Sequence, residues 1–260
     1  MNLTQSKIYA KDGFDSKAFL RAYFPGDPPM SFGIETMKFP IEKMTQACTS
    51  GKMKGDLLMD ISIGPLVHFL YPMCNSFKEI VLLRFSERCI LELRKWQNGH
   101  TEAFNWPKSL LDVTALLGDS KELEMKDTLL KSLIKQVVRC DTEKENLTDP
   151  LQLPQADGVT SAWILEVISP DETKYQSNLR KILACLKPGG RLFLIGVVGG
   201  TYYMVGNQRM HLFNNNANFV EKALAKEGLT VTQREVLPRI ALNDLSDYKG
   251  MLFIEACKNK

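Results

Sequence analysis

Short apolar runs alternate with amphipathic stretches from Gly55 to the end of the chain. The apolar runs have the length of strands, and the stretches between them have helical spacing. We expect strands near residues 56–61, 79–84, 158–164 and 191–197, and helices near 65–74, 86–96 and 171–186. Strands that alternate with helices predict an α/β fold with a mostly parallel sheet.

The two ends of the chain follow different patterns. The last two expected strands, 229–237 and 250–258, have no helix between them, which is typical of an antiparallel hairpin at a sheet edge. Near the start, Asp15 is a candidate N-cap for a helix that the prolines of 25–29 interrupt. A second helix is expected over 39–51. These early helices predict a cap over the larger core.

The middle of the chain is expected to supply the third strand. Leu129, Leu133 and Val137 recur at helical spacing, so residues 123–138 are expected to form a helix. The third strand then lies around the sequence VRCD, which ends at Asp141.

Length and composition limit the range of functions. The 260 residues are enough for one domain, with residues 1–54 as the helical cap and 55–260 as a Rossmann-like core. The net charge of +3 is small and the charges are interspersed, so we expect no nucleic-acid or membrane partner. No secretion signal or membrane-length apolar run is present, and the six cysteines form no C-x-x-C pair. We expect a cytoplasmic monomer that binds at most a small molecule.

The stretch GDLLMDISIGP, residues 55–65, is a buried strand that runs into a glycine turn. In α/β proteins such a turn lets a nucleotide approach the backbone closely. Ile63 stands in the middle of this turn, where a stiff branched side chain hinders close approach.

Several motifs in this order resemble those of one family. They are GDLLMDISIGP, SFKEIVLLRFSE, LELRKWQ followed by EAFNW, VRCD, LKPGG and YYMVGNQ. The chain is similar over nearly its whole length to the class I S-adenosylmethionine-dependent methyltransferases of the nicotinamide, indolethylamine and phenylethanolamine N-methyltransferase group. The resemblance implies a Rossmann-like seven-stranded sheet, mostly parallel, with an antiparallel C-terminal hairpin and an N-terminal helical cap.

The resemblance also implies which positions surround the methyl donor and the amine. The donor positions are Tyr9, Tyr23, Ser62, Ile63, Gly64, His68, Arg84, Phe85, Asp141, Thr142 and Ala162. The substrate positions are Trp163, Glu166, Gly196 and Tyr203. No residue is assigned a catalytic role, because methyl transfer to an amine depends mainly on alignment of the reacting atoms.

Several donor positions do not carry the family's residues. Ser62 stands where the family has its first glycine, and Ile63 stands where it has its serine. Arg84 stands where the family has the acidic residue that binds the ribose. Arginine has no acceptor and repels a cationic sulfonium ligand. We therefore expect that the protein binds no cofactor, has lost catalysis and serves as a binding or structural protein. The alternative is an active S-adenosylmethionine-dependent N-methyltransferase of a small amine with a rebuilt donor site.

Arg84 has two further interpretations. In one it is a surface arginine paired with Glu87. In the other, Arg84, Ser86 and Arg88 offer donors to the phosphate of an anionic nucleotide, although no G-x-G-x-x-G motif is present.

The substrate positions are altered as well. Trp163 is bulkier than the family's usual residue, and Gly196 stands where nicotinamide enzymes carry a carboxylate. A Trp163 ring that points inward would bury most of its surface and fill part of the amine pocket. His68, His100 and His211 are far apart in the sequence, so no metal site is expected.

Overall fold

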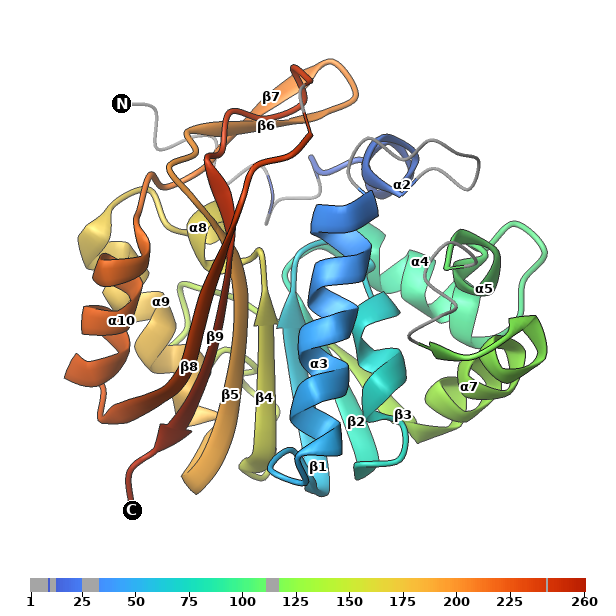
Figure 1. The fold of residues 1–260 in the computed structure, drawn as a ribbon, viewed down its shortest axis with the longest axis horizontal. Helices are drawn as coiled ribbons and strands as arrows, with labels where there is room; N and C mark the ends of the chain where they lie inside the picture. Colours follow the sequence, from blue (N-terminus) through green and yellow to red (C-terminus); the bar gives the residue numbers. More distant parts are fainter. Residues whose placement is uncertain (1–8, 10–12, 25–32, 111–116, 242) are drawn as a thin grey trace.

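The computed structural model describes Tyr9 and residues 13–24, 33–110, 117–241 and 243–260. Its main sheet has seven strands in the order β3-β2-β1-β4-β5-β9-β8 (Figure 1). The strands are β1 (Gly55–Ser62), β2 (Phe77–Arg84), β3 (Ile134–Arg139), β4 (Ala156–Ala162), β5 (Leu186–Val198), β8 (Leu229–Pro238) and β9 (Gly250–Lys258). The first five are paired in parallel, and β9 is antiparallel to both β5 and β8. The predicted sheet and its C-terminal antiparallel pair are confirmed.

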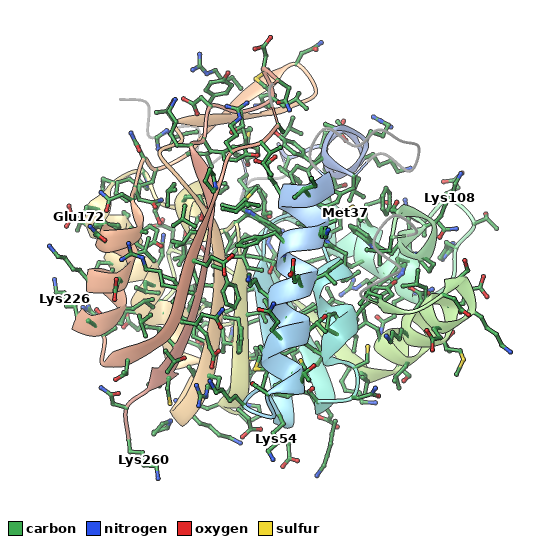
Figure 2. All side chains as sticks on the ribbon, viewed as in Figure 1. Met37, Lys54, Lys108, Glu172, Lys226 and Lys260 are labelled. Carbon is green, nitrogen blue, oxygen red and sulfur yellow. The ribbon has the colours of Figure 1, made fainter. Side chains whose placement is uncertain are left out.

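Helices surround the sheet in the described part of the chain. They are α2 (Ser16–Tyr23), η1 (Gly33–Lys38), α3 (Phe39–Thr49), η2 (His68–Met73), α4 (Glu87–Gln97), α5 (Trp106–Ser109), α7 (Ser120–Leu133), α8 (Leu165–Ile168), α9 (Glu172–Ala184) and α10 (Ala217–Lys226). Helices α4 and α7 contact β2 and β3, whereas α9 contacts β5 and α10 contacts β8. Side chains fill the space between helices and sheet, and charged residues such as Lys108, Glu172 and Lys226 lie on the outside (Figure 2).

Side-chain caps explain where several helices begin. Asp15 accepts a hydrogen bond from the backbone N–H of Ala18 at the start of α2, as its sequence position predicts. Asp171 and Asn216 cap α9 and α10 in the same way. These caps fix the ends of the helices that frame the sheet.

Helix α2 lies at the carboxyl ends of the parallel strands, whereas α3 runs alongside the sheet and packs against η2 (Figure 1). Helix α2 buries Phe19, Leu20 and Tyr23 along one face, which agrees with the helical spacing in the sequence. The predicted proline break at 25–29 lies outside the described residues. A π-helix, η1, then leads directly into α3.

A small hairpin completes this end of the molecule. Strands β6 (Tyr202–Val205) and β7 (Gln208–His211) pair antiparallel and lie near α2 (Figure 1). The Tyr23 hydroxyl donates to the Met204 carbonyl at 3.1 Å and to the Leu245 carbonyl at 3.0 Å, and it accepts from the Met204 N–H at 3.2 Å. One phenol thus joins α2, the hairpin and the loop before β9.

Two local predictions need correction. The expected helix over 123–138 ends at Leu133, and Ile134–Arg139 forms edge strand β3 instead. The β-branched residues Ile134, Val137 and Val138 favour a strand, and pairing with β2 outweighs the helical spacing. The expected helix over 65–74 is reduced to the 3₁₀ helix η2, which contains Pro72.

Most of the large apolar side chains that the structure describes are buried. Strand β1 is buried from Leu57 to Ser62, as expected for the centre of a parallel sheet. No helix within the described residues is long and apolar enough to cross a membrane.

We predict that the Tyr23 hydroxyl contributes to stability through its contacts to the hairpin. Tyr23→Phe should lower the free energy of unfolding by about 1–2 kcal/mol, because it removes hydrogen bonds in a mostly buried site. Tyr203→Phe is the matched control, since the buried Tyr203 hydroxyl has no hydrogen-bond partner in the part of the chain that the structure describes. Urea unfolding of both variants checks this, and equal losses would contradict it.

Candidate functional site

The sheet reverses its strand order between β1 and β4. In open α/β sheets, ligands bind beyond the carboxyl ends of the strands at such a switch point. In this chain the β1 turn, the segment after β4 and the end of β5 meet there, below α2 and the β6–β7 hairpin.

Arg84 at the end of β2 is fully buried and turns back beneath the β1 turn. Its Nε donates to the Gly64 carbonyl at 2.8 Å, and its Nη1 donates to the carbonyls of Asp60 and Leu83 at 3.0 and 2.9 Å. Its Nη2 donates to the Asp60 carboxylate at 2.6 Å and to the Leu66 carbonyl at 2.8 Å. A guanidinium has five N–H donors, so every one of them is used within the protein.

The Asp60 carboxylate holds this arginine and two neighbouring hydroxyls. Asp60 Oδ2 forms the ion pair with Arg84, and both side chains are completely buried. Asp60 Oδ1 accepts from the hydroxyls of Ser62 at 2.7 Å and Thr160 at 2.6 Å. The network therefore connects the ends of β1, β2 and β4, and we call it the Arg84–Asp60 network.

The backbone N–H groups of Ile63 and Gly64, in the glycine turn after β1, are also hydrogen-bonded within the protein. The Ile63 N–H donates to the Ala162 carbonyl at 2.9 Å, and the Gly64 N–H donates to the Tyr9 hydroxyl at 2.7 Å. Gly64 has φ of +60°, and a Cβ there would lie 2.9 Å from a ring carbon of Phe19. The N–H groups that a nucleotide-binding turn offers to its ligand are thus bonded to the protein itself.

These contacts correct both further interpretations of Arg84. It is no surface residue, and its ion-pair partner is Asp60, whereas Glu87 lies 3.7 Å from Arg139. It has no donor left for a nucleotide phosphate, and Ser86 beside it is buried too.

The other donor positions lie around this network. Phe85 is buried directly after β2, and Ala162 is buried at the end of β4. Asp141 and Thr142 follow β3, and the Asp141 side chain is exposed. Asp141 Oδ1 accepts from the Glu143 N–H at 2.9 Å in a local turn. Asp141 is therefore the donor position that still presents a carboxylate to solvent.

His68 belongs to a ladder of aromatic rings. Its imidazole is nearly parallel to the rings of Trp106 and Trp163, with centroids 5.3 and 6.2 Å away. His68 Nε2 donates to the Thr36 carbonyl at 2.7 Å, whereas the buried Nδ1 has no hydrogen-bond partner among the residues described. Burial lowers the pKa of His68 to about 3, so the ring is neutral at physiological pH. Its role in the structure is packing.

Trp163 directly follows β4 and turns its ring inward. It is the one non-glycine residue with positive φ, +51°, among the described residues, and 8% of its surface is exposed. The Trp163 backbone N–H donates to the Ile195 carbonyl at 2.7 Å, which holds this uncommon conformation. The prediction that Trp163 buries most of its ring is confirmed.

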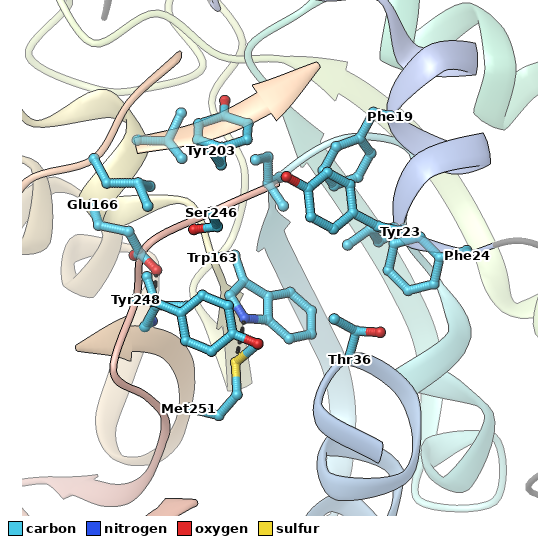
Figure 3. Close-up of a pocket in the computed structure, with 15 residues that line it drawn as sticks. Phe19, Tyr23, Phe24, Thr36, Trp163, Glu166, Tyr203, Ser246, Tyr248 and Met251 are labelled. Atoms are coloured by element: carbon cyan, nitrogen blue, oxygen red, sulfur yellow. Dashed lines mark hydrogen bonds between the residues drawn. The ribbon is translucent and has the colours of Figure 1, made fainter. Parts of the chain in front are cut away.

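A cavity remains beside the Trp163 ring (Figure 3). It has about 520 Å³ of space free of protein atoms, part of which is open to solvent. The lining residues are Phe19, Tyr23, Phe24, Thr36, Ile63, Leu66, Trp163, Glu166, Val167, Val197, Tyr203, Leu212, Ser246, Tyr248 and Met251. Of the predicted positions, the structure brings Tyr23, Ile63, Trp163, Glu166 and Tyr203 together here, whereas Arg84 and Asp141 lie outside the lining.

Glu166 on α8 packs against the end of β5. Its Oε1 accepts from the Val197 N–H at 2.9 Å, and burial raises the pKa of its carboxyl to about 7. A Cβ at Gly196 would lie 3.2 Å from the same oxygen. The glycine therefore makes room for Glu166, and a larger acidic residue at position 196 would crowd it.

The sequence analysis missed Asp60, Ser246, Tyr248 and Met251 as site residues. Asp60 could have been identified from the sequence, because it lies within one apolar run and Arg84 lies at the end of the next. An acidic residue and an arginine in such runs are expected to form a buried ion pair. Ser246, Tyr248 and Met251 come from the loop before β9 and its start, and only the fold brings them to the cavity. Among the described residues, no group of three or more His, Cys, Asp and Glu side chains could hold a metal ion.

A family model described as the NNMT/PNMT/TEMT family matches residues 2–259. The chain belongs to this family. It is 30% identical to human nicotinamide N-methyltransferase, with 94% of this chain and 93% of that protein covered. It is 28% identical to mouse indolethylamine N-methyltransferase over 96% of this chain and 94% of that protein. With macaque phenylethanolamine N-methyltransferase it shares 30% identity, over 94% and 89% of the two chains.

Solved structures agree with this family fold. Magnesium protoporphyrin IX methyltransferase from Synechocystis with bound S-adenosylmethionine has a TM-score of 0.61 and 11% identity, with 99% of each chain covered. A 1,6-didemethyltoxoflavin N1-methyltransferase from Burkholderia thailandensis has a TM-score of 0.56 and 15% identity, with 100% of this chain and 93% of that chain covered. At these identities the likeness concerns the class I methyltransferase fold.

We predict that removing Arg84 destabilises this family member strongly. Arg84→Ala should lower the free energy of unfolding by about 3–5 kcal/mol, because it leaves the Asp60 carboxylate buried without its cation. Arg139→Ala is the control: Arg139 is the register neighbour of Arg84 on β3, is half exposed, and should cost under ~1 kcal/mol.

Urea unfolding of both variants measures the difference, and Arg84→Lys provides a milder case if Arg84→Ala does not fold. Lysine keeps the charge but offers three donors where arginine offers five. Equal losses for Arg84→Ala and Arg139→Ala, or an Arg84→Lys variant as stable as the wild type, would contradict the prediction.

We also predict that His68 destabilises the fold in acid. Between pH 6.5 and 3 the unfolded chain binds a proton at this residue and the folded chain does not, so stability falls as the pH falls through that window. The wild type should therefore lose about 3 kcal/mol relative to His68→Phe between pH 7 and pH 4. Urea unfolding at pH 4, 5, 6 and 7 tests this.

The comparison cancels the contribution of Glu166, which has the opposite sign. The raised pKa of its carboxyl makes the folded chain hold a proton between pH 4.5 and 7, so that stability from Glu166 is lost as the pH rises. Because both proteins contain Glu166, a stability difference that stays constant with pH would contradict the role of His68.

Proposed function

We propose that this protein has lost methyl transfer and binds a small molecule in the cavity beside Trp163. The observation that carries the proposal is the Arg84–Asp60 network. Where the family has an acidic residue for the ribose, this chain has a buried guanidinium whose five donors are all used. No acceptor for the ribose hydroxyls remains at that position.

Two neighbouring features support the same proposal. The turn that would approach the donor carries the Ile63 side chain, and its N–H groups are bonded to Ala162 and Tyr9. A ligand at this turn would have to break those bonds. A hydrogen bond to a charged group contributes about 1.5–3 kcal/mol, so losing the ribose acceptor alone corresponds to roughly ten- to a hundredfold weaker binding.

The alternative is an active N-methyltransferase of a small amine. It is favoured by the exposed Asp141 carboxylate after β3, which matches the family's adenine-side residue, and by the open cavity next to Glu166. In this case S-adenosylmethionine would bind with the Arg84–Asp60 network intact or rearranged.

Calorimetric titration with S-adenosylmethionine and S-adenosylhomocysteine separates the two functions. We expect dissociation constants above ~100 µM and no transfer of a labelled methyl group to nicotinamide, tryptamine or phenylethanolamine. A constant near 1 µM, which corresponds to about −8.2 kcal/mol, or label in any of the amines, would favour the active enzyme.

A variant series tests the cause of weak binding. Ser62→Gly, Ile63→Ser and Arg84→Asp together should bind S-adenosylmethionine at least about tenfold more tightly than the wild type, because they restore the acceptor and the turn. The control carries Ser62→Gly and Ile63→Ser alone and keeps Arg84. If the control gains as much affinity as the triple variant, Arg84 is not the cause.

A further inference from the structure

Two of the polar residues that line the cavity, Tyr23 and Ser246, use their hydroxyls in hydrogen bonds within the protein. The Tyr23 hydroxyl is bonded to the Met204 and Leu245 carbonyls, and the Ser246 hydroxyl donates to the Tyr202 carbonyl at 2.7 Å. The surface that these residues present to the cavity is almost entirely apolar.

Two further polar groups on the cavity wall are engaged in the same way. Glu166 Oε1 accepts from the Val197 N–H, and Trp163 Nε1 donates to the Met251 sulfur at 3.3 Å. Figure 3 shows both contacts at the wall beneath the Tyr248 ring. The buried hydroxyls of Tyr203 and Tyr248 are the polar groups of the lining that have no hydrogen-bond partner among the described residues. A polar ligand would therefore find few partners, and leaving water without compensation is unfavourable for it.

The charges around the cavity point to an uncharged ligand. Among the described residues, the lining contains no lysine, arginine or histidine, and Glu166 is the one acidic residue in it. Glu166 Oε1 is bonded to the Val197 N–H and the carboxyl packs at Gly196, so an ammonium group in the cavity would compete with these contacts for the carboxyl. A buried ammonium without a carboxylate partner is strongly disfavoured.

The shape of the wall favours a flat ligand. Trp163 forms one side and is backed by the parallel rings of His68 and Trp106. Phe19 and Phe24 from α2 and its C-cap lie on another side (Figure 3). Aromatic walls of this kind make offset-stacked and edge-to-face contacts with a ring.

From these contacts we propose that the cavity binds an uncharged, apolar aromatic molecule of one or two fused rings. The inference rests on the proposed function, since it names the ligand class of the same cavity. It differs from an amine site in requiring no carboxylate, and the ligand is held by ring contacts and by removal of apolar surface from water.

Calorimetry with three matched probes tests the ligand class. Indole is uncharged and apolar, tryptamine adds an ammonium group to the same ring system, and nicotinamide is uncharged but carries a polar amide. At pH 7.5 we expect indole to bind with a dissociation constant on the order of 10–100 µM. Tryptamine and nicotinamide should each bind at least tenfold more weakly, because their polar groups find no partner.

Two valines at the end of β5 locate the binding. Val197 lines the cavity, and Val198 has its side chain on the other face of the strand. Val197→Phe should weaken indole binding at least tenfold, whereas Val198→Phe should change it less than twofold. Unfolding midpoints of both variants establish that they fold, and equal affinities for indole would overturn the assignment to this cavity.

Glu166→Gln separates the apolar site from an amine site. If tryptamine binds as tightly as indole and loses affinity in Glu166→Gln, the cavity is an amine site and the inference is wrong. Absence of saturable indole binding to the wild type also overturns it. Donor titration is read independently: tight S-adenosylmethionine binding together with a preference for indole would reject the proposed function and keep the ligand class.

Discussion

The ion pair between Arg84 and Asp60 determines the architecture of the candidate site. Two opposite charges lie in a fully buried position at the ends of adjacent parallel strands, which is tolerable because every donor of the guanidinium and both oxygens of the carboxylate have partners. The arginine holds the Gly64 and Leu66 carbonyls, so the conformation of the β1 turn depends on it. A guanidinium offers no hydrogen-bond acceptor, so the Arg84 side chain supplies none at the end of β2.

The turn that Arg84 holds also forms part of the cavity wall, through Ile63 and Leu66. With the turn held by Arg84, Ile63 faces Trp163 across the switch point between β1 and β4, and both residues line the cavity. Trp163 has a left-handed backbone conformation, and its ring forms part of the cavity wall. The Glu166 carboxyl packs on the end of β5, in the space that Gly196 leaves open. A fold shared with methyl-transferring enzymes thus presents an apolar cavity beside an internally satisfied turn.

Much of this architecture follows from local sequence signals. The apolar runs and the caps at Asp15 and Asp171 predict the strands and helices, because these preferences are local and agree with the tertiary fold. The third strand was expected around VRCD but begins earlier, at Ile134, since the pattern before Val138 fits a helix until the pairing with β2 is known. The β6–β7 hairpin was also missed, and its position depends on contacts to Tyr23 and the loop before β9.

The site could be predicted in its positions but not in its geometry. The sequence shows that the acidic residue after β2 is replaced by Arg84, yet it does not show whether the side chain points to solvent or into the turn. A direct measurement is the hydrogen exchange of the Arg84 Nε–H by nitrogen-15 NMR, before and after addition of millimolar S-adenosylhomocysteine. The account predicts a strongly protected signal that the nucleoside does not alter. A rapidly exchanging Nε–H, or a signal that shifts and loses protection as the nucleoside binds, would contradict it.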